Sequence, residues 1–152
     1  MKLIMKTDNN LFFLCSLIEF IGRQKKLKRH DVVHSLGYDT VRHIYEYADV
    51  LHCEPIAKVA DEYIELCKIN TGNFDNVADC KYSVPSYWDI GKVYARLIQD
   101  VTENLSETDE IIKTLHKVYG SWIDDSISNF NSDFFYQPRD YLRECYFSEE
   151  IF

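Results

Sequence analysis

Apolar side chains recur at intervals of three and four residues along most of this 152-residue chain. The clearest run extends from Leu11 to Ile21, and a second long run extends from Ile90 to Val101. This spacing places apolar side chains on one face of an α-helix, where they can pack into a core. Only five Gly and three Pro are present, too few for a sandwich of short strands. The sequence therefore predicts an all-α fold of six to eight helices.

Turn-forming residues divide the chain into two predicted helical units. Residues 1–70 contain four expected helices, which form an N-terminal four-helix unit. Asn, Asp and Gly are frequent in residues 71–85, which form the predicted linker. Residues 86–152 are expected to form a C-terminal helical unit that packs on the first. A single compact domain made of both units is the alternative.

Capping residues predict where individual helices begin and end. Asn9 or Asn10 can cap the first helix, which is expected to end at Gly22. The pattern further along leaves open whether Gly120 ends one helix or Ser121 caps a new one. The other expected helix starts involve Asp39, Pro55, a capping box of Ser86 and Asp89, and Pro138.

Composition and motif content exclude several classes of protein. With 46% hydrophobic residues, the chain can bury a core and is not disordered. Its five Cys lack metal-site spacing and are typical of reduced thiols in a cytoplasmic protein. Glu19 interrupts the first apolar run, and no run reaches 18 residues, so neither a signal peptide nor a membrane span is predicted. Without a glycine-rich phosphate loop or a nucleophile elbow, no cofactor and no catalytic residue is predicted.

Two histidines resemble part of a zinc-protease motif. His30 and His34 lie one turn apart on a predicted helix, as in H-E-x-x-H. Asp31 occupies the position of the Glu, and Thr40 occupies the third-ligand position of the longer motif. A metal site around His30 and His34 is therefore one hypothesis, and two half-exposed histidines are the alternative.

A basic segment, defined as residues 23–30, stands out in an acidic chain. Residues 1–30 carry seven Lys and Arg against two Asp and Glu, whereas the whole chain has a net charge of -8. Such a segment can bind phosphates or an acidic protein. A helix-turn-helix reading is weakened because the second helix would present Asp39, Glu46 and Asp49 to the phosphates. The candidate contact residues are Arg23, Lys25, Lys26, Lys28 and Arg29.

Aromatic residues are concentrated near the C-terminus. Four of them lie in or beside the non-periodic stretch 129–138, where they can either fill the adjacent core or anchor an interface. Both interpretations stay open, and the interface candidates are Phe134, Phe135 and Tyr136.

Residues 10–69 resemble a family of small bacterial domains of unknown function. The similarity lies in the apolar stretch from Phe12 to Phe20, in Tyr45 and Tyr47, and in the segments Val50-Leu51-His52 and Val59 to Ile64. Members of this family are often encoded beside ADP-ribosyltransferase-like proteins, in arrangements suggestive of toxin and antitoxin or of phage defence. The resemblance implies a protein partner of that kind and supplies no catalytic residue.

These observations lead to three hypotheses of function. The first is a non-enzymatic protein-interaction module that acts as an antitoxin-like or accessory partner of a toxin or phage-defence protein. The second is a nucleic-acid-binding regulator that uses the basic segment. The third is a metal-dependent hydrolase around His30 and His34.

Overall fold

The computed structural model describes residues 6–152, and these residues form eight α-helices, one short 3-10 helix and no strand. The predicted all-α fold of six to eight helices is therefore confirmed. The helices are α1 (Asn9–Lys25), α2 (Arg29–Leu36), α3 (Tyr38–Leu51), α4 (Ile56–Leu66), α5 (Tyr87–Val101), α6 (Thr108–Tyr119), α7 (Trp122–Ser128), the 3-10 helix η1 (Phe134–Tyr136) and α8 (Arg139–Ser148).

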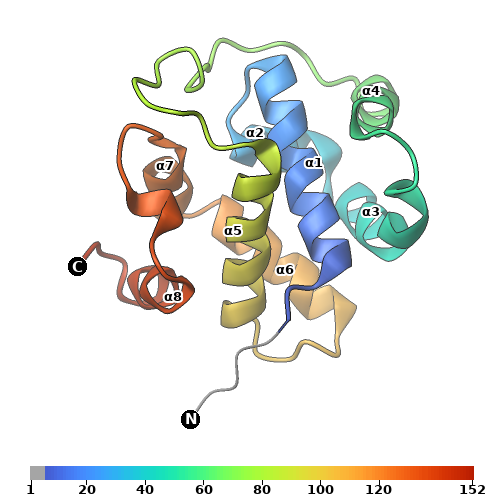
Figure 1. Cartoon of the computed structure of the whole chain (residues 1–152). Helices are drawn as coiled ribbons and strands as arrows, with labels where there is room; N and C mark the ends of the chain where they lie inside the picture. The colour runs from blue at the N-terminus through green and yellow to red at the C-terminus, as the bar shows by residue number, and fades with distance from the viewer. Residues whose placement is uncertain (1–5) are drawn as a thin grey trace.

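Helices α1 and α5 lie side by side at the centre of the molecule (Figure 1). Helix α1 also contacts α2, α3 and α4, whereas α5 also contacts α6, α8 and η1. One hydrophobic core contains buried side chains from both helices, including Leu14 and Ile18 of α1 and Ile90 and Ile98 of α5. The two predicted units thus share a core, because the central helix of each packs against the other.

A close approach between α1 and α5 explains a glycine inside a helix. A Cβ atom added at Gly91 would lie 2.1 Å from Oγ of Ser16 and 2.7 Å from its Cα. Gly in a helix interior costs about 1 kcal/mol relative to Ala. Here, the missing side chain allows the two backbones to meet where both helices are buried.

Helix α1 differs from its predicted limits at both ends. Its N-cap is Asp8, not Asn9 or Asn10, and the Asp8 carboxylate accepts hydrogen bonds from two backbone N–H groups of the first turn. The helix passes through Gly22 and ends at Lys25, since Lys26 takes the left-handed conformation with φ 54°. Gly22 is buried, and a Cβ there would lie 3.1 Å from the Leu27 carbonyl oxygen. Gly22 therefore serves packing rather than helix termination.

Most other helix boundaries follow their capping residues. Ser86 and Asp89 form the predicted capping box of α5. Gly120 caps the end of α6, and the Ser121 hydroxyl accepts a hydrogen bond from a backbone N–H at the start of α7. One helix therefore ends at Gly120 and a new one is capped by Ser121. Asp39 is an exception, because α3 is capped by Gly37 and Asp39 lies within its first turn. The N-caps of α4 and α8 are Pro55 and Pro138.

The predicted linker, residues 71–85, contains no helix and runs along the C-terminal end of α1 (Figure 1). The N–H of Gly72 donates to the carbonyl of Lys25 over 2.8 Å, and the N–H of Phe74 donates to that of Lys26 over 2.9 Å. A Cβ at Gly72 would lie 2.6 Å from the Lys26 carbonyl oxygen. The linker is therefore held against the basic segment by backbone contacts.

None of the helices within residues 6–152 has the length and the hydropathy needed to cross a membrane. All five cysteines are free, with Cys15 and Cys145 buried and Cys53 exposed.

Candidate functional site

Arg29, the last cation of the basic segment, lies in the interior of the protein. Its side chain is 4% exposed. Its Nε donates to Oε2 of Glu19 over 2.8 Å, and one terminal nitrogen donates to Oδ1 of Asp124 over 3.1 Å. That same nitrogen is 2.6 Å from Oγ of Ser128 and 3.3 Å from the Tyr94 hydroxyl. We call this set of five residues the Arg29 network.

The Arg29 network corrects the prediction that Arg29 belongs to a contact surface. Glu19 comes from α1, Tyr94 from α5, and Asp124 and Ser128 from α7, so the guanidinium group connects four helices, including its own. The guanidinium carbon also lies 5.0 Å from the centre of the Tyr94 ring, within the range of a cation–π contact. This role depends on residues up to 99 positions apart.

The charges in the Arg29 network compensate one another. Burial acts to lower the pKa of Arg29, but Glu19, Tyr94 and Asp124 outweigh it and hold that pKa well above its ordinary value. Burial raises the pKa of Asp124, although Arg29 and a hydrogen bond from the Tyr94 hydroxyl oppose the shift. A buried charge needs such partners, because an unpaired one would be strongly destabilising.

Three of the remaining cations of the basic segment also have partners within the chain. Arg23 donates to Glu19 over 3.2 Å and to the Pro85 carbonyl over 2.7 Å.

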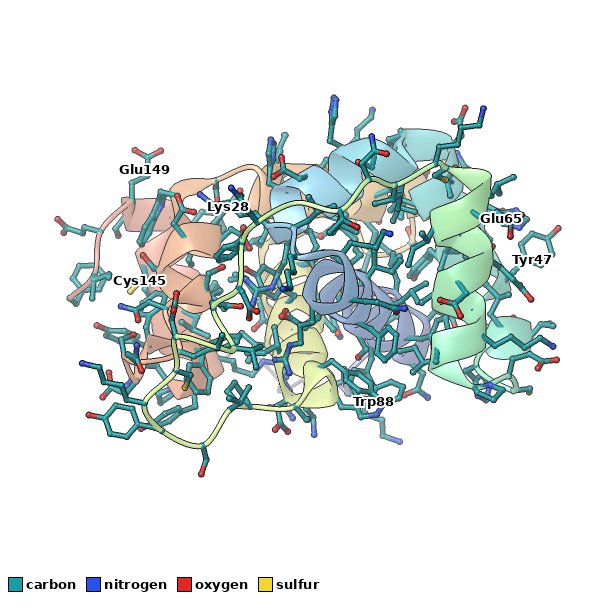
Figure 2. All side chains as sticks on the ribbon, turned by 90° about the horizontal axis from the view of Figure 1, so that it is seen from above. Lys28, Tyr47, Glu65, Trp88, Cys145 and Glu149 are labelled. Carbon is teal, nitrogen blue, oxygen red and sulfur yellow. The ribbon has the colours of Figure 1, made fainter. Side chains whose placement is uncertain are left out.

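Lys26 lies 4.0 Å from Asp75, and Lys28 lies 3.7 Å from Asp125 and beside the Phe74 ring. Figure 2 shows Lys28 beside the linker. Lys25 has no ion pair within residues 6–152. The segment therefore offers less free positive charge than its sequence indicates.

The two histidines of the metal hypothesis lie on the surface of α2. His30 and His34 are both exposed. Within the described part of the chain, no group of three or more His, Cys, Asp or Glu side chains is placed to hold a metal ion. The structure thus gives this pair no additional ligand among those residues.

The aromatic stretch contributes to the core and to the surface. Phe134 is 5% exposed and belongs to the hydrophobic core, which corrects its assignment as an interface candidate. Tyr136 is 68% exposed, and Phe135 between them is partly buried. The short 3-10 helix η1 separates the three side chains in this way, because its turns carry neighbouring residues to different faces.

Tyr82 of the linker joins Phe135 and Tyr136 at one hollow, and we call these three residues the aromatic surface. Tyr82 is 70% exposed. The hollow has a volume of about 910 Å³, and its polar rim includes Asn131 and Asp133. Tyr82 was not among the predicted site residues, because a single tyrosine in a turn-rich segment has no periodic pattern to mark it.

A second cavity is lined by residues of α5, η1 and α8, and we call it the α5–α8 cavity. It has a volume of about 320 Å³. Phe135 and Tyr136 line both this cavity and the hollow of the aromatic surface. Its remaining lining residues include the cations Lys92, Arg96 and Arg139 and the apolar residues Val93, Leu97 and Leu142. These cations were not among the predicted site residues, because they occupy ordinary polar positions of amphipathic helices.

A separate aromatic group surrounds Trp88 near the start of α5. The Trp88 ring packs edge-on against Phe12 at 5.6 Å and contacts Tyr87 at 5.0 Å. A cavity of about 400 Å³ beside it is also lined by Asp49 and His52. Figure 2 shows Trp88 and Tyr47 at separate places on the periphery of the molecule. Since Trp88 is 39% exposed and packed on Phe12, it mainly covers its own core.

Comparisons with protein-family models, with curated proteins and with solved structures find no match to this chain. The resemblance of residues 10–69 to small bacterial domains therefore stays a prediction.

Proposed function

We propose that this protein is a non-enzymatic interaction module that binds another protein through its aromatic surface. The observation that carries the proposal is the joint exposure of Tyr82, at 70%, and Tyr136, at 68%, around one hollow. Aromatic side chains are enriched at protein interfaces, where they bury a large area with little loss of conformational freedom. Phe135 is partly buried, and its ring centre lies 4.9 Å from that of the exposed Tyr136.

The proposed partner is the one that the resemblance implies, an ADP-ribosyltransferase-like protein of a toxin or phage-defence system. An antitoxin-like or accessory chain needs a specific contact surface and a stable fold. The aromatic surface would supply the contact. The Arg29 network would help to hold the helices behind it, because the backbone oxygen of its Ser128 accepts a hydrogen bond from Asn76 of the linker.

The test is co-expression of the protein with the products of its neighbouring genes, followed by co-purification and light scattering. We expect one of these proteins to form a stoichiometric complex with the wild type. Substituting both exposed tyrosines, in Y82S/Y136S, should abolish the complex, because interface aromatics of this kind each contribute about 2 kcal/mol or more. Both side chains are exposed, so the variant should remain folded.

Tyr47 provides the matched control. It is 51% exposed on α3, at a separate place from the aromatic surface, so Y47S should keep the complex intact. A complex that survives Y82S/Y136S would show that the aromatic surface is not the binding site. A wild-type protein that remains alone with every neighbouring product would count against the proposed partner.

A further inference from the structure

We propose that the α5–α8 cavity binds an acidic segment of the partner protein. In this arrangement, one apolar or aromatic side chain of the segment enters the cavity, and its neighbouring carboxylates contact Lys92 and Arg96. The inference rests on the proposed function and names the chemistry of the partner.

The first argument is charge complementarity. Lys92 and Arg96 are four residues apart, so they lie on the same side of α5. Within residues 6–152, neither has an ion-pair partner, and Arg96 makes one hydrogen bond, from Nε to Thr7. By contrast, Arg139 is paired with Asp100 through two bonds of 2.9 and 2.7 Å. Two uncompensated cations beside one cavity, in a chain of net charge -8, are suited to a ligand with carboxylates.

Asp89 is the acidic group that also lines the cavity. Its carboxylate accepts a bond from the backbone N–H of Ser86 over 3.0 Å as part of the capping box. The N-terminus of α5 stabilises this negative charge. Asp89 is therefore engaged at the helix start, and Lys92 and Arg96 remain to face a ligand.

The second argument is the apolar lining behind the cations. The lining includes Val93 and Leu97 of α5, Leu142 of α8, and the aromatic rings of Phe135 and Tyr136. A volume of about 320 Å³ lies at the lower end of the range for ligand sites, which suits one large side chain. An acidic segment with an apolar anchor would match both the charge and the lining.

A protein segment fits these features better than a nucleic acid. Binding to a nucleic acid derives mainly from several cations that neutralise successive phosphates. Here, only two of the three lining cations, Lys92 and Arg96, lack an ion pair within residues 6–152, and the aromatic surface shares Phe135 and Tyr136 with the cavity. One acidic segment could therefore cover the cavity while the rest of the partner covers Tyr82.

The experiment selects random displayed peptides on the wild-type protein and sequences the enriched pool. We expect enrichment of peptides in which Asp or Glu flanks Phe, Trp or Leu. The best peptide, synthesised and measured by fluorescence anisotropy, should bind K92E/R96E at least about tenfold more weakly. Its affinity should also fall as salt increases.

The matched control is K113E/K117E, which reverses two exposed cations with the same four-residue spacing on α6. It changes the net charge equally, so peptide binding should remain close to wild type. The proposal would be overturned by selected peptides that are neutral or basic, by the absence of any enrichment, or by an equal loss of peptide binding in both variants. If a 20-nucleotide single-stranded DNA bound more tightly than the best peptide, through Lys92 and Arg96, the ligand of the cavity would be a nucleic acid and not an acidic segment.

The same variants separate this inference from the proposed function. A partner complex that is lost in Y82S/Y136S but unchanged in K92E/R96E would overturn the acidic segment and keep the aromatic interface. A complex that is unaffected by either variant would remove both proposals.

Discussion

The Arg29 network and the aromatic surface combine similar groups in opposite environments. In the first, a guanidinium, two carboxylates and the Tyr94 ring contact one another, and Arg29 is 4% exposed. In the second, Tyr82 and Tyr136 face the solvent, with Tyr136 at 68% exposure. Groups that satisfy one another hold helices together, whereas groups left without internal partners are available to another molecule.

This difference follows from the surroundings of each region. Helices α1, α2, α5 and α7 surround Arg29, so its charge is removed from water and must be paired within the protein. The aromatic surface lies on the linker and on η1, at the edge of the helical body, where water can solvate polar groups. Substitutions in each region can show whether the two differ in energy as they do in environment.

The largest effect is expected from removing the charge of Arg29. R29M keeps most of the side-chain volume but leaves Glu19 and Asp124 without their cation, and we expect a loss of about 3–5 kcal/mol in the free energy of unfolding. Urea denaturation monitored by circular dichroism measures this loss. The matched control is K28M, at an exposed neighbouring position, which should stay within about 0.5 kcal/mol of wild type.

A triple variant sharpens this result. In E19Q/R29M/D124N, the uncompensated carboxylates are gone as well, so part of the lost stability should return. If R29M alone lowers the free energy of unfolding by less than about 1 kcal/mol, the Arg29 network contributes little to holding the helices together.

Two unequal effects are expected within the aromatic stretch itself, one as large as that of R29M and one much smaller. F134A should destabilise the protein by about 3–5 kcal/mol, because it empties a buried position of the core. Y136A, two residues away and exposed, should change stability by about 0.5 kcal/mol or less while weakening partner binding. Thermal unfolding and co-purification measure the two properties separately. Equal destabilisation by both changes would erase the distinction between core and surface in η1.

The smallest effect concerns the pH dependence of stability. Burial raises the folded-state pKa of Asp124 above its ordinary value of 3.8. The folded state therefore holds this proton more tightly than the unfolded state. Its contribution to the free energy of unfolding falls as pH rises from about 4 to the raised pKa, and is constant above it. The stability of the wild type relative to D124N should thus decrease with pH over that window.

Urea denaturation at a series of pH values and constant salt measures this difference. D125N makes the same chemical change at an exposed neighbour and serves as the control. An advantage of the wild type over D124N that grows with pH would mean that Arg29 and Tyr94 stabilise the Asp124 carboxylate more than burial destabilises it.

The sequence by itself determined the helices. Apolar residues at three- and four-residue spacing placed the helices, and local capping groups such as Ser86 with Asp89 marked where they begin. These signals act over one or two turns, so they are readable from the chain. The aromatic stretch was also recognisable from composition, although its division into core and surface was not.

The tertiary structure decided which of the candidate residues face outward. Arg29 became a buried residue because Asp124, 95 positions away, meets it together with Glu19 of the preceding helix. Gly22 became a packing residue inside α1, and Tyr82 joined Tyr136 across 54 positions. Burial and pairing of charge depend on which surfaces meet when helices pack. That information is not contained in the spacing of residues along any single helix.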